Sequence, residues 1–112
     1  MRANLQFAVF VGGDLRDAWL GWADLREAVL YQADLEGAAL AYADLRKADL
    51  RDADLRQAVL TEADLQEATL TGADLRQPIL DDTKLQEAVM DGRTRWPDDF
   101  DPVAAGVKRS GD

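Results

Sequence analysis

Residues 63–77 read Ala-Asp-Leu-Gln-Glu, Ala-Thr-Leu-Thr-Gly and Ala-Asp-Leu-Arg-Gln, which are three successive units of five residues. The same unit recurs through residues 3–92, with a large apolar residue, here called the centre, at its third position. Eighteen centres run from Leu5 to Met90, and sixteen of them are Leu. In fifteen units the residue two positions before the centre is Ala. A repeat this regular decides the architecture and has to be interpreted first.

A five-residue period fits neither of the common secondary structures. On an α-helix each residue turns by about 100°, so successive centres would be displaced by about 140° and no apolar stripe would form. On a flat strand side chains alternate, so an odd period would send successive centres to opposite faces. Neither element can therefore bury the centres together.

A short extended segment followed by a turn does satisfy the pattern. Within a unit the Ala and the centre are two residues apart, which places both on the same side of an extended segment. The two residues after the centre are free to turn the chain, so the repeat predicts a coil with Ala and Leu inside. Stacked coils about 4.8 Å apart let backbone groups bond to the coils above and below.

The sequence resembles the pentapeptide-repeat family, whose pattern is Ala-(Asp/Asn)-Leu-X-X, and the match covers residues 3–92. The resemblance implies an all-β fold, a right-handed quadrilateral β-helix with four units per coil. Eighteen units would then make about four and a half coils, or roughly 22 Å of rod. We expect residues 3–92 to form this helix and residues 93–112 to form a C-terminal capping tail.

Length and composition limit the functional classes. A chain of 112 residues forms one domain, and no stretch is apolar enough to span a membrane. The chain enters the repeat at Ala3, which leaves no room for a signal peptide, so we expect a cytoplasmic protein. The net charge of −9 disfavours direct binding to nucleic acid or to an anionic membrane surface. A basic protein partner is more plausible.

Residues twenty apart should stack on one another if a coil holds four units. Two sides of the rod would then carry columns of Asp, and the other two would carry mainly apolar residues at the same position. Asp49 departs from this alternation. Several Asp residues are followed two positions later by Arg, which can offset the repulsion between stacked carboxylates. These arginines are Arg16, Arg26, Arg46, Arg56 and Arg76.

The N-terminal coils contain most of the aromatic residues. Trp19, Trp22, Tyr31 and Tyr42 are expected to point outward and form a candidate interaction patch, although scattered exposure of aromatic residues is also common. No cap is evident before Leu5. The first coil is therefore expected to stack on a second copy or on another protein, unless the N-terminal apolar residues close the end by themselves.

The repeat loses its regularity near the C-terminus. Pro78 and Thr83 replace Ala, and the tail reads Trp96-Pro97-Asp98-Asp99-Phe100-Asp101-Pro102. The last coil of a solenoid exposes an apolar cross-section and unpaired strand edges that need a cover. We expect Trp96, Pro97 and Phe100 to form this cap, with binding of a partner as the alternative role, and residues after Ala105 to fray. A tail of this type resembles that of many bacterial, especially cyanobacterial, family members.

The residue inventory argues against catalysis. The chain has no His and no Cys, and its one Ser is Ser110 in the tail, so the usual nucleophile–base pairs cannot be assembled. Zinc-type ligand sets and phosphate-binding loops are also missing, and a core filled by Leu and Ala leaves no room for a substrate. We therefore predict no enzyme activity, no cofactor, no metal site and no small-molecule substrate.

Two functions remain open. The first is a non-catalytic structural or interaction module that contacts a protein partner, or itself, through its N-terminal coils. The second, which some members of the family imply, is a DNA mimic that inhibits a type II topoisomerase such as gyrase. Residues 3–92 carry a net charge of −10, from 18 acidic and 8 basic residues. About 22 Å of B-DNA carries roughly thirteen charges, so the magnitude is comparable, but the interleaved arginines weaken the likeness.

Overall fold

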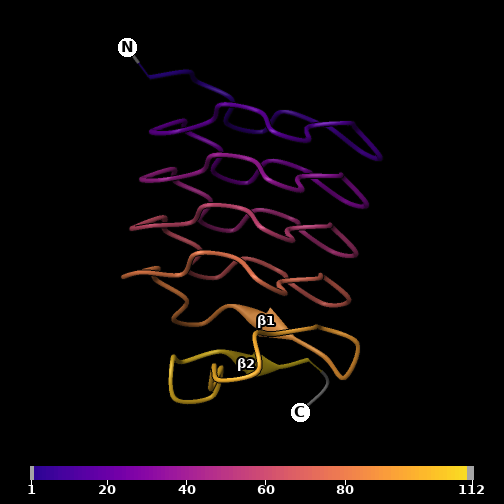
Figure 1. Ribbon diagram of the computed structural model, residues 1–112. Helices are drawn as coiled ribbons and strands as arrows, with labels where there is room; N and C mark the ends of the chain where they lie inside the picture. Colours follow the sequence, from indigo (N-terminus) through magenta and orange to yellow (C-terminus); the bar gives the residue numbers. More distant parts are fainter. Residues whose placement is uncertain (1, 111–112) are drawn as a thin grey trace.

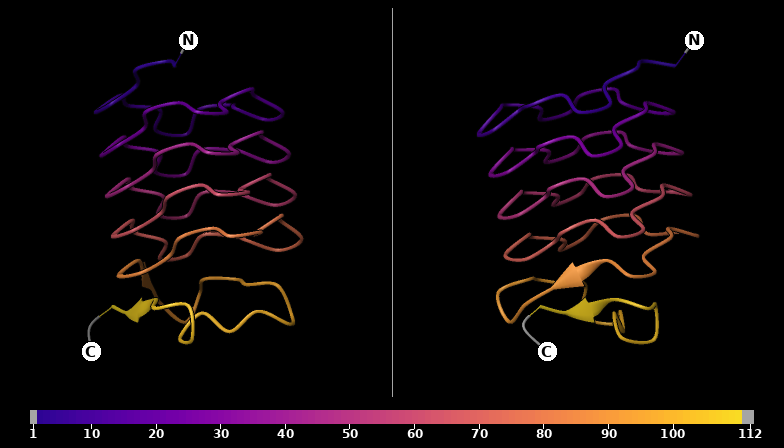
Figure 2. Two further views of the ribbon diagram at one scale, coloured as in Figure 1. Left: turned by 90° about the vertical axis from the view of Figure 1, so that its left-hand side faces the viewer. Right: turned by 180° about the vertical axis from the view of Figure 1, so that it is seen from behind.

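The chain winds into a stack of coils, each lying beneath the segment twenty residues earlier, as the computed structural model of residues 2–110 shows (Figure 1). Parallel bridges join residues that are twenty positions apart, from Asn4 and Asp24 to Thr69 and Val89. Twenty residues are four units of the repeat, so each coil has four sides. The coils keep this stacking when the molecule is seen from the side and from behind (Figure 2).

The backbone itself sets the register of the stack. On a typical side, the amide of Leu45 donates to the carbonyl oxygen of Asp64 (2.7 Å), and the amide of Asp64 donates to that of Ala43 (2.9 Å). The same pair of bonds repeats along the sides of the rod. Each coil therefore satisfies the main-chain polar groups of its neighbours, as buried backbone requires.

Each corner of the coil is a tight turn between a centre and the next Ala. At a typical corner the Ala48 amide donates to the Leu45 carbonyl oxygen (3.0 Å), and Lys47, the second turn residue, has a φ of 61°. Fourteen non-glycine residues have a positive φ, all at this second corner position, although the left-handed region costs such residues about 1 kcal/mol or more. At Gly72 a side chain is also excluded by lack of space, because an added Cβ would lie 2.0 Å from Oδ1 of Asp52.

The core is the predicted double column of Ala and Leu. From Ala23 to Leu75, every Ala and Leu at these inward positions is at most 1% exposed. In the first coil, by contrast, Leu5, Phe10, Leu15 and Leu20 are only partly buried, because no coil lies above them. Burial is therefore complete one coil below the N-terminal end.

The register shifts by one residue near the C-terminus. Asp74 is bridged to Arg95, twenty-one positions later, and Trp96 rather than residue 95 packs against the core. Thr94 takes the inward position of Ala, and its hydroxyl donates to the carbonyl oxygen of Leu70 (2.8 Å). Thr83 makes the equivalent bond to Leu60 (2.7 Å). The hydroxyl of each Thr is thus satisfied within an otherwise apolar column.

The last described residues return to the coil. Strand β1 (Val89–Met90) pairs in parallel with β2 (Lys108–Arg109), as Figure 1 shows. Val107 is 5% exposed, and the Lys108 and Ser110 amides donate to the carbonyl oxygens of Ala88 and Met90. The expectation that the chain frays after Ala105 is therefore wrong for residues 106–110, because a buried Val and a strand edge hold them. Residues 111–112 of that expectation lie outside the described residues.

No helix that could cross a lipid bilayer is found among residues 2–110.

Candidate interaction surfaces

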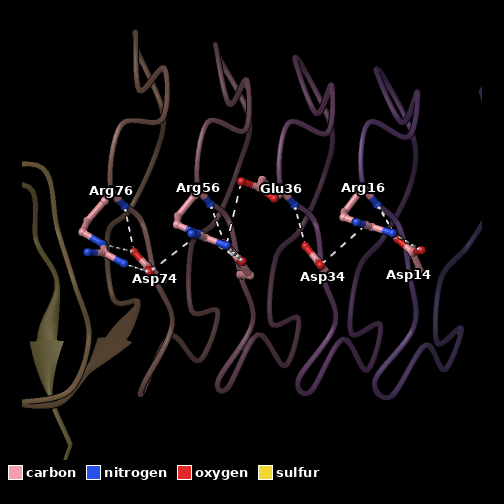
Figure 3. Close-up of polar contacts among 8 residues, drawn as sticks. Asp14, Arg16, Asp34, Glu36, Arg56, Asp74 and Arg76 are labelled. Carbon is pink, nitrogen blue, oxygen red and sulfur yellow. Dashed lines mark hydrogen bonds and ion pairs between the residues drawn. The ribbon is translucent and has the colours of Figure 1, made fainter.

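Two sides of the rod carry columns of Asp residues, most of them paired with Arg, and Figure 3 shows one of these columns. In the column shown, Nε and Nη2 of Arg16 donate to the two carboxylate oxygens of Asp14, each at 2.9 Å. Nε of Arg16 also lies 3.7 Å from Oδ2 of Asp34 in the next coil. Arg26, Arg46 and Arg56 repeat both contacts, whereas Arg76, within the described residues, pairs only with its own Asp74. This two-residue spacing is what the sequence led us to expect.

These pairs hold the carboxylates in their charged form. The hydrogen bonds from the Arg16 side chain lower the pKa of Asp14 from 3.8 to about 2, and those from Arg26 lower the pKa of Asp24 to about 2. The side-chain bonds from the neighbouring arginines also lower the pKa values of Asp44 and Asp54. Five of the seven Asp residues in the two columns are thus hydrogen-bonded to an arginine side chain inside the molecule.

Three carboxylates of one column lie close enough together to hold a cation. One oxygen from each of Asp34, Glu36 and Asp54 lies within 4.8 Å of the others. Nη2 of Arg56 is 2.6 Å from Asp54 and 3.8 Å from Glu36. The guanidinium group of Arg56 already supplies Asp54 and Glu36 with positive charge, and that of Arg16 lies 3.7 Å from Asp34.

Asp49, which breaks the alternation of the columns, has its own partner. Nη2 of Arg51 lies 2.7 Å from Oδ2 of Asp49, and the guanidinium group of Arg51 stands over the Tyr31 ring at 4.9 Å. The sequence signal was present, because Arg51 follows Asp49 by the same two residues as in the other pairs.

Three of the four aromatic residues singled out in the sequence, Trp19, Trp22 and Tyr42, lie on one side of the rod and its adjoining corner. The rings of Trp22 and Tyr42 are stacked with centroids 4.3 Å apart and an interplanar angle of 3°. Trp19 precedes this corner and is 93% exposed, and Arg2 lies over the Trp22 ring at 5.9 Å. We call Trp19, Trp22 and Tyr42 the aromatic patch.

Tyr31 is not brought to this patch. Its turn is the corner diagonally opposite that of Trp22, because ten residues are half a coil. Its ring faces Arg51 instead. The twenty-residue register alone predicts that Trp22 stacks on Tyr42, as observed, whereas Tyr31 was grouped with them only by its closeness along the chain.

The N-terminal end of the rod is open as well as apolar. Within residues 2–110, no backbone hydrogen bond involves the N–H or C=O groups of Val9, Asp14 and Trp19. The residues that stack beneath these three donate upward, as the Val29 amide does to the Ala8 carbonyl oxygen (2.8 Å). This end therefore combines a half-buried apolar cross-section with free strand edges.

Near the C-terminal end, two aromatic residues of the tail are partly buried. Trp96 and Phe100 pack against the core with ring centroids 5.2 Å apart. Pro97 lies between them in sequence and is half-buried, and its carbonyl oxygen accepts a bond from the Phe100 amide (3.1 Å). The two ends of the rod thus differ in their exposed apolar surface.

Comparison with known proteins yields both a family and related structures. The family model for pentapeptide repeats matches in eight copies over residues 20–57, 40–77 and 53–92. No curated protein matches the sequence. A pentapeptide repeat protein of the Arabidopsis thaliana thylakoid lumen is 32% identical, with a TM-score of 0.63, and the alignment covers 86% of this chain. The chain spans 59% of the length of that protein.

Two cyanobacterial structures extend the comparison. A pentapeptide repeat protein from Nostoc is 33% identical over 97% of this chain and 86% of its own, with a TM-score of 0.43. One from Cyanothece is 37% identical over 84% of this chain and 60% of its own, with a TM-score of 0.42. The repeat, the twenty-residue register and the family match agree: this chain belongs to the pentapeptide-repeat family, whose members fold as right-handed quadrilateral β-helices.

Proposed function

We propose that the protein is a non-catalytic interaction module whose contact surface lies on its N-terminal coils. The observation that carries this proposal is the aromatic patch, in which an almost fully exposed Trp19 stands beside the stacked rings of Trp22 and Tyr42. Large exposed aromatic groups that are rigidly held are typical of protein contact sites. Family membership agrees with this role, since pentapeptide repeats generally serve as scaffolds rather than enzymes.

The asymmetry of the two ends supports this placement. In this proposal residues 3–92 form about four and a half coils, and the tail from residue 93 caps the last of them with Trp96, Pro97 and Phe100. Five large apolar side chains of the first coils are more than half exposed. They are Phe7, Val9, Val11, Trp19 and Trp22. The contact is made with a partner protein or, through the open end, with a second copy.

A photo-crosslinking amino acid at position 22 tests the proposal in cells that make the protein. The matched control places the same amino acid at Glu67, which occupies the same corner position and also has a positive φ. We expect a discrete adduct from position 22 and none from position 67. Adducts of equal yield from both positions, or from neither, would overturn the proposal.

Light scattering tests whether the contact is made with a second copy of the chain. A Trp19→Ser, Trp22→Ser variant is compared with the wild type at equal concentration. A dimer mass that falls to the monomer mass in the variant supports self-association through this end, and an unchanged monomer mass for both excludes it.

Mimicry of DNA toward gyrase is the less favoured function. The net charge of −10 over residues 3–92 favours it, but the bidentate arginines place positive charge along both Asp columns. A DNA supercoiling assay decides between the two functions. Inhibition of gyrase at micromolar protein would support mimicry, and full activity would remove it.

A further inference from the structure

One side of the rod carries an unbroken apolar column. Trp19, Ala39, Val59 and Ile79 are bridged one below the other, and none of them is charged. Trp19 is 93% exposed and Ile79 is 45% exposed, with Ala39 and Val59 half-buried between them. We call this column the apolar side. At about 4.8 Å per coil, it runs straight for about 14 Å.

The other sides of the rod lack such a surface. Across the rod, the column of Val9 and Val29 is interrupted by Asp49 and its bonded Arg51. The two remaining sides are the Asp columns, in which most of the carboxylates accept hydrogen bonds from guanidinium groups. The apolar side is therefore the place where a partner can bury apolar groups without disrupting an internal ion pair.

The corner next to the apolar side bears three acidic residues that form no ion pair with Lys or Arg among the described residues. Below Tyr42, the same corner position is taken by Glu62 and then by Asp82, with Asp81 beside it. Among residues 2–110, no Lys or Arg nitrogen lies within 4.0 Å of these three carboxylates. Tyr42, Glu62 and Asp82 share one corner position in successive coils, and a hydrogen bond with Glu62, together with the charges of Glu62 and Asp82, raises the pKa of Tyr42. We call Glu62, Asp81 and Asp82 the acidic corner.

We propose that the apolar side and the acidic corner together bind a basic amphipathic segment of a partner protein. Apolar side chains of the segment would cover Ala39, Val59 and Ile79, and its Lys or Arg residues would meet the acidic corner. A helix of about ten residues spans the 14 Å column. This inference rests on the proposed function and identifies the chemistry of the partner.

The negative charge of the protein favours a basic segment over a second copy of the chain, nucleic acid or anionic lipid. A second copy would bring a net charge of −9 and the same unpaired acids to the contact, which like-charge repulsion disfavours. Nucleic acid and anionic lipid are repelled for the same reason. A cationic segment is attracted, and its arginines can also stack on the exposed Trp19.

The experiment uses a twelve-residue synthetic peptide with Leu at helical spacing and Arg elsewhere, titrated into the isotope-labelled full chain. We expect saturable chemical-shift changes at the Trp19 indole and at the methyl groups of Val59 and Ile79. The methyl groups of Val29 and Val89, across the rod, serve as the internal control and should not move. A permuted peptide of the same composition, without an apolar face, should bind at least fivefold more weakly.

Two charge variants with the same loss of charge test the acidic corner. Glu62→Gln with Asp82→Asn removes two of its carboxylates, and Glu27→Gln with Glu67→Gln removes two from the same position of another corner. We expect peptide binding to weaken about fivefold or more in the first variant and less than twofold in the second. All four positions have a positive φ, and Gln already occupies this conformation at Gln57 and Gln77, so both variants should fold.

Several results would overturn the inference. They include equal losses of peptide binding in the two charge variants, equal binding of the permuted peptide, and chemical-shift changes centred on Val29. Self-association of the wild type that a Val59→Lys substitution abolishes would also overturn it, by identifying a second copy as the occupant. If the peptide fails to bind while crosslinking at position 22 persists, this inference fails and the proposed function stands.

Discussion

Replacing Leu45 by Ala should reveal how rigidly the stack supports its core. Leu45 is fully buried between coils whose spacing is set by hydrogen bonds such as that from its own amide to Asp64. Because this ladder prevents the coils from closing on the vacated space, the cavity should persist. Leu→Ala substitutions that leave such a cavity cost about 3–5 kcal/mol. We expect a loss of free energy of unfolding in the upper half of this range.

Leu15→Ala is the matched control. It removes the same atoms from the same position of the unit, but Leu15 belongs to the first coil and is only partly buried. The loss of free energy of unfolding in Leu15→Ala should be about half as large as in Leu45→Ala, roughly 1.5–2.5 kcal/mol.

Urea unfolding followed by circular dichroism measures both losses. Equal m-values for wild type and variants would show that the change lies in stability rather than in the extent of unfolding. A loss below about 1.5 kcal/mol for Leu45→Ala, or equal losses for the two variants, would refute the account of a stack that cannot relax.

Three other substitutions or truncations test separate features. Gly72→Ala should lower the free energy of unfolding in urea by about 1 kcal/mol or more, because Gly72 has a φ of 73° and an added Cβ would meet Asp52. Gly92→Ala is the control: an added Cβ there has nothing within 4 Å, and the loss should be less than about 0.5 kcal/mol. Because the pKa of Asp14 is depressed to about 2, its contribution to stability is complete above the unfolded pKa near 4 and is lost as the pH falls toward 2. Arg16→Gln should return the pKa of Asp14 toward 3.8 in an NMR titration, and an unchanged value would contradict the assignment to the side-chain bonds. Removal of residues 106–112 should lower the urea midpoint, since Val107 is buried; an unchanged midpoint would show that the last strand contributes nothing.

The core and the register could be read from the sequence because each depends only on the period. Once the inward residues were identified, four units per coil placed Asp44 above Asp64 and Leu45 above Leu65, and the structure has both pairs stacked. The Asp–Arg pairs were predictable for the same reason. Their spacing of two residues within a unit is local.

The candidate surfaces were harder to predict because they depend on position around the coil. Tyr31 and Trp22 are nine residues apart in sequence yet occupy opposite corners of the rod. The shift that brings Arg95 under Asp74 follows from one extra residue, which no propensity signals. Val107 was missed because a single apolar residue in a polar tail gives no period to detect.

At the second residue of each corner, the side chain varies while the backbone conformation stays the same. Phe7, Trp22, Glu27, Lys47 and Gln57 all adopt nearly the same left-handed backbone there, with φ between 57° and 66°. Aromatic, acidic, basic and amide side chains are therefore interchangeable at these sites as far as the main chain is concerned. The surface residues of the rod can thus be substituted, one corner at a time, without any change to the layers of Ala and Leu that form the core.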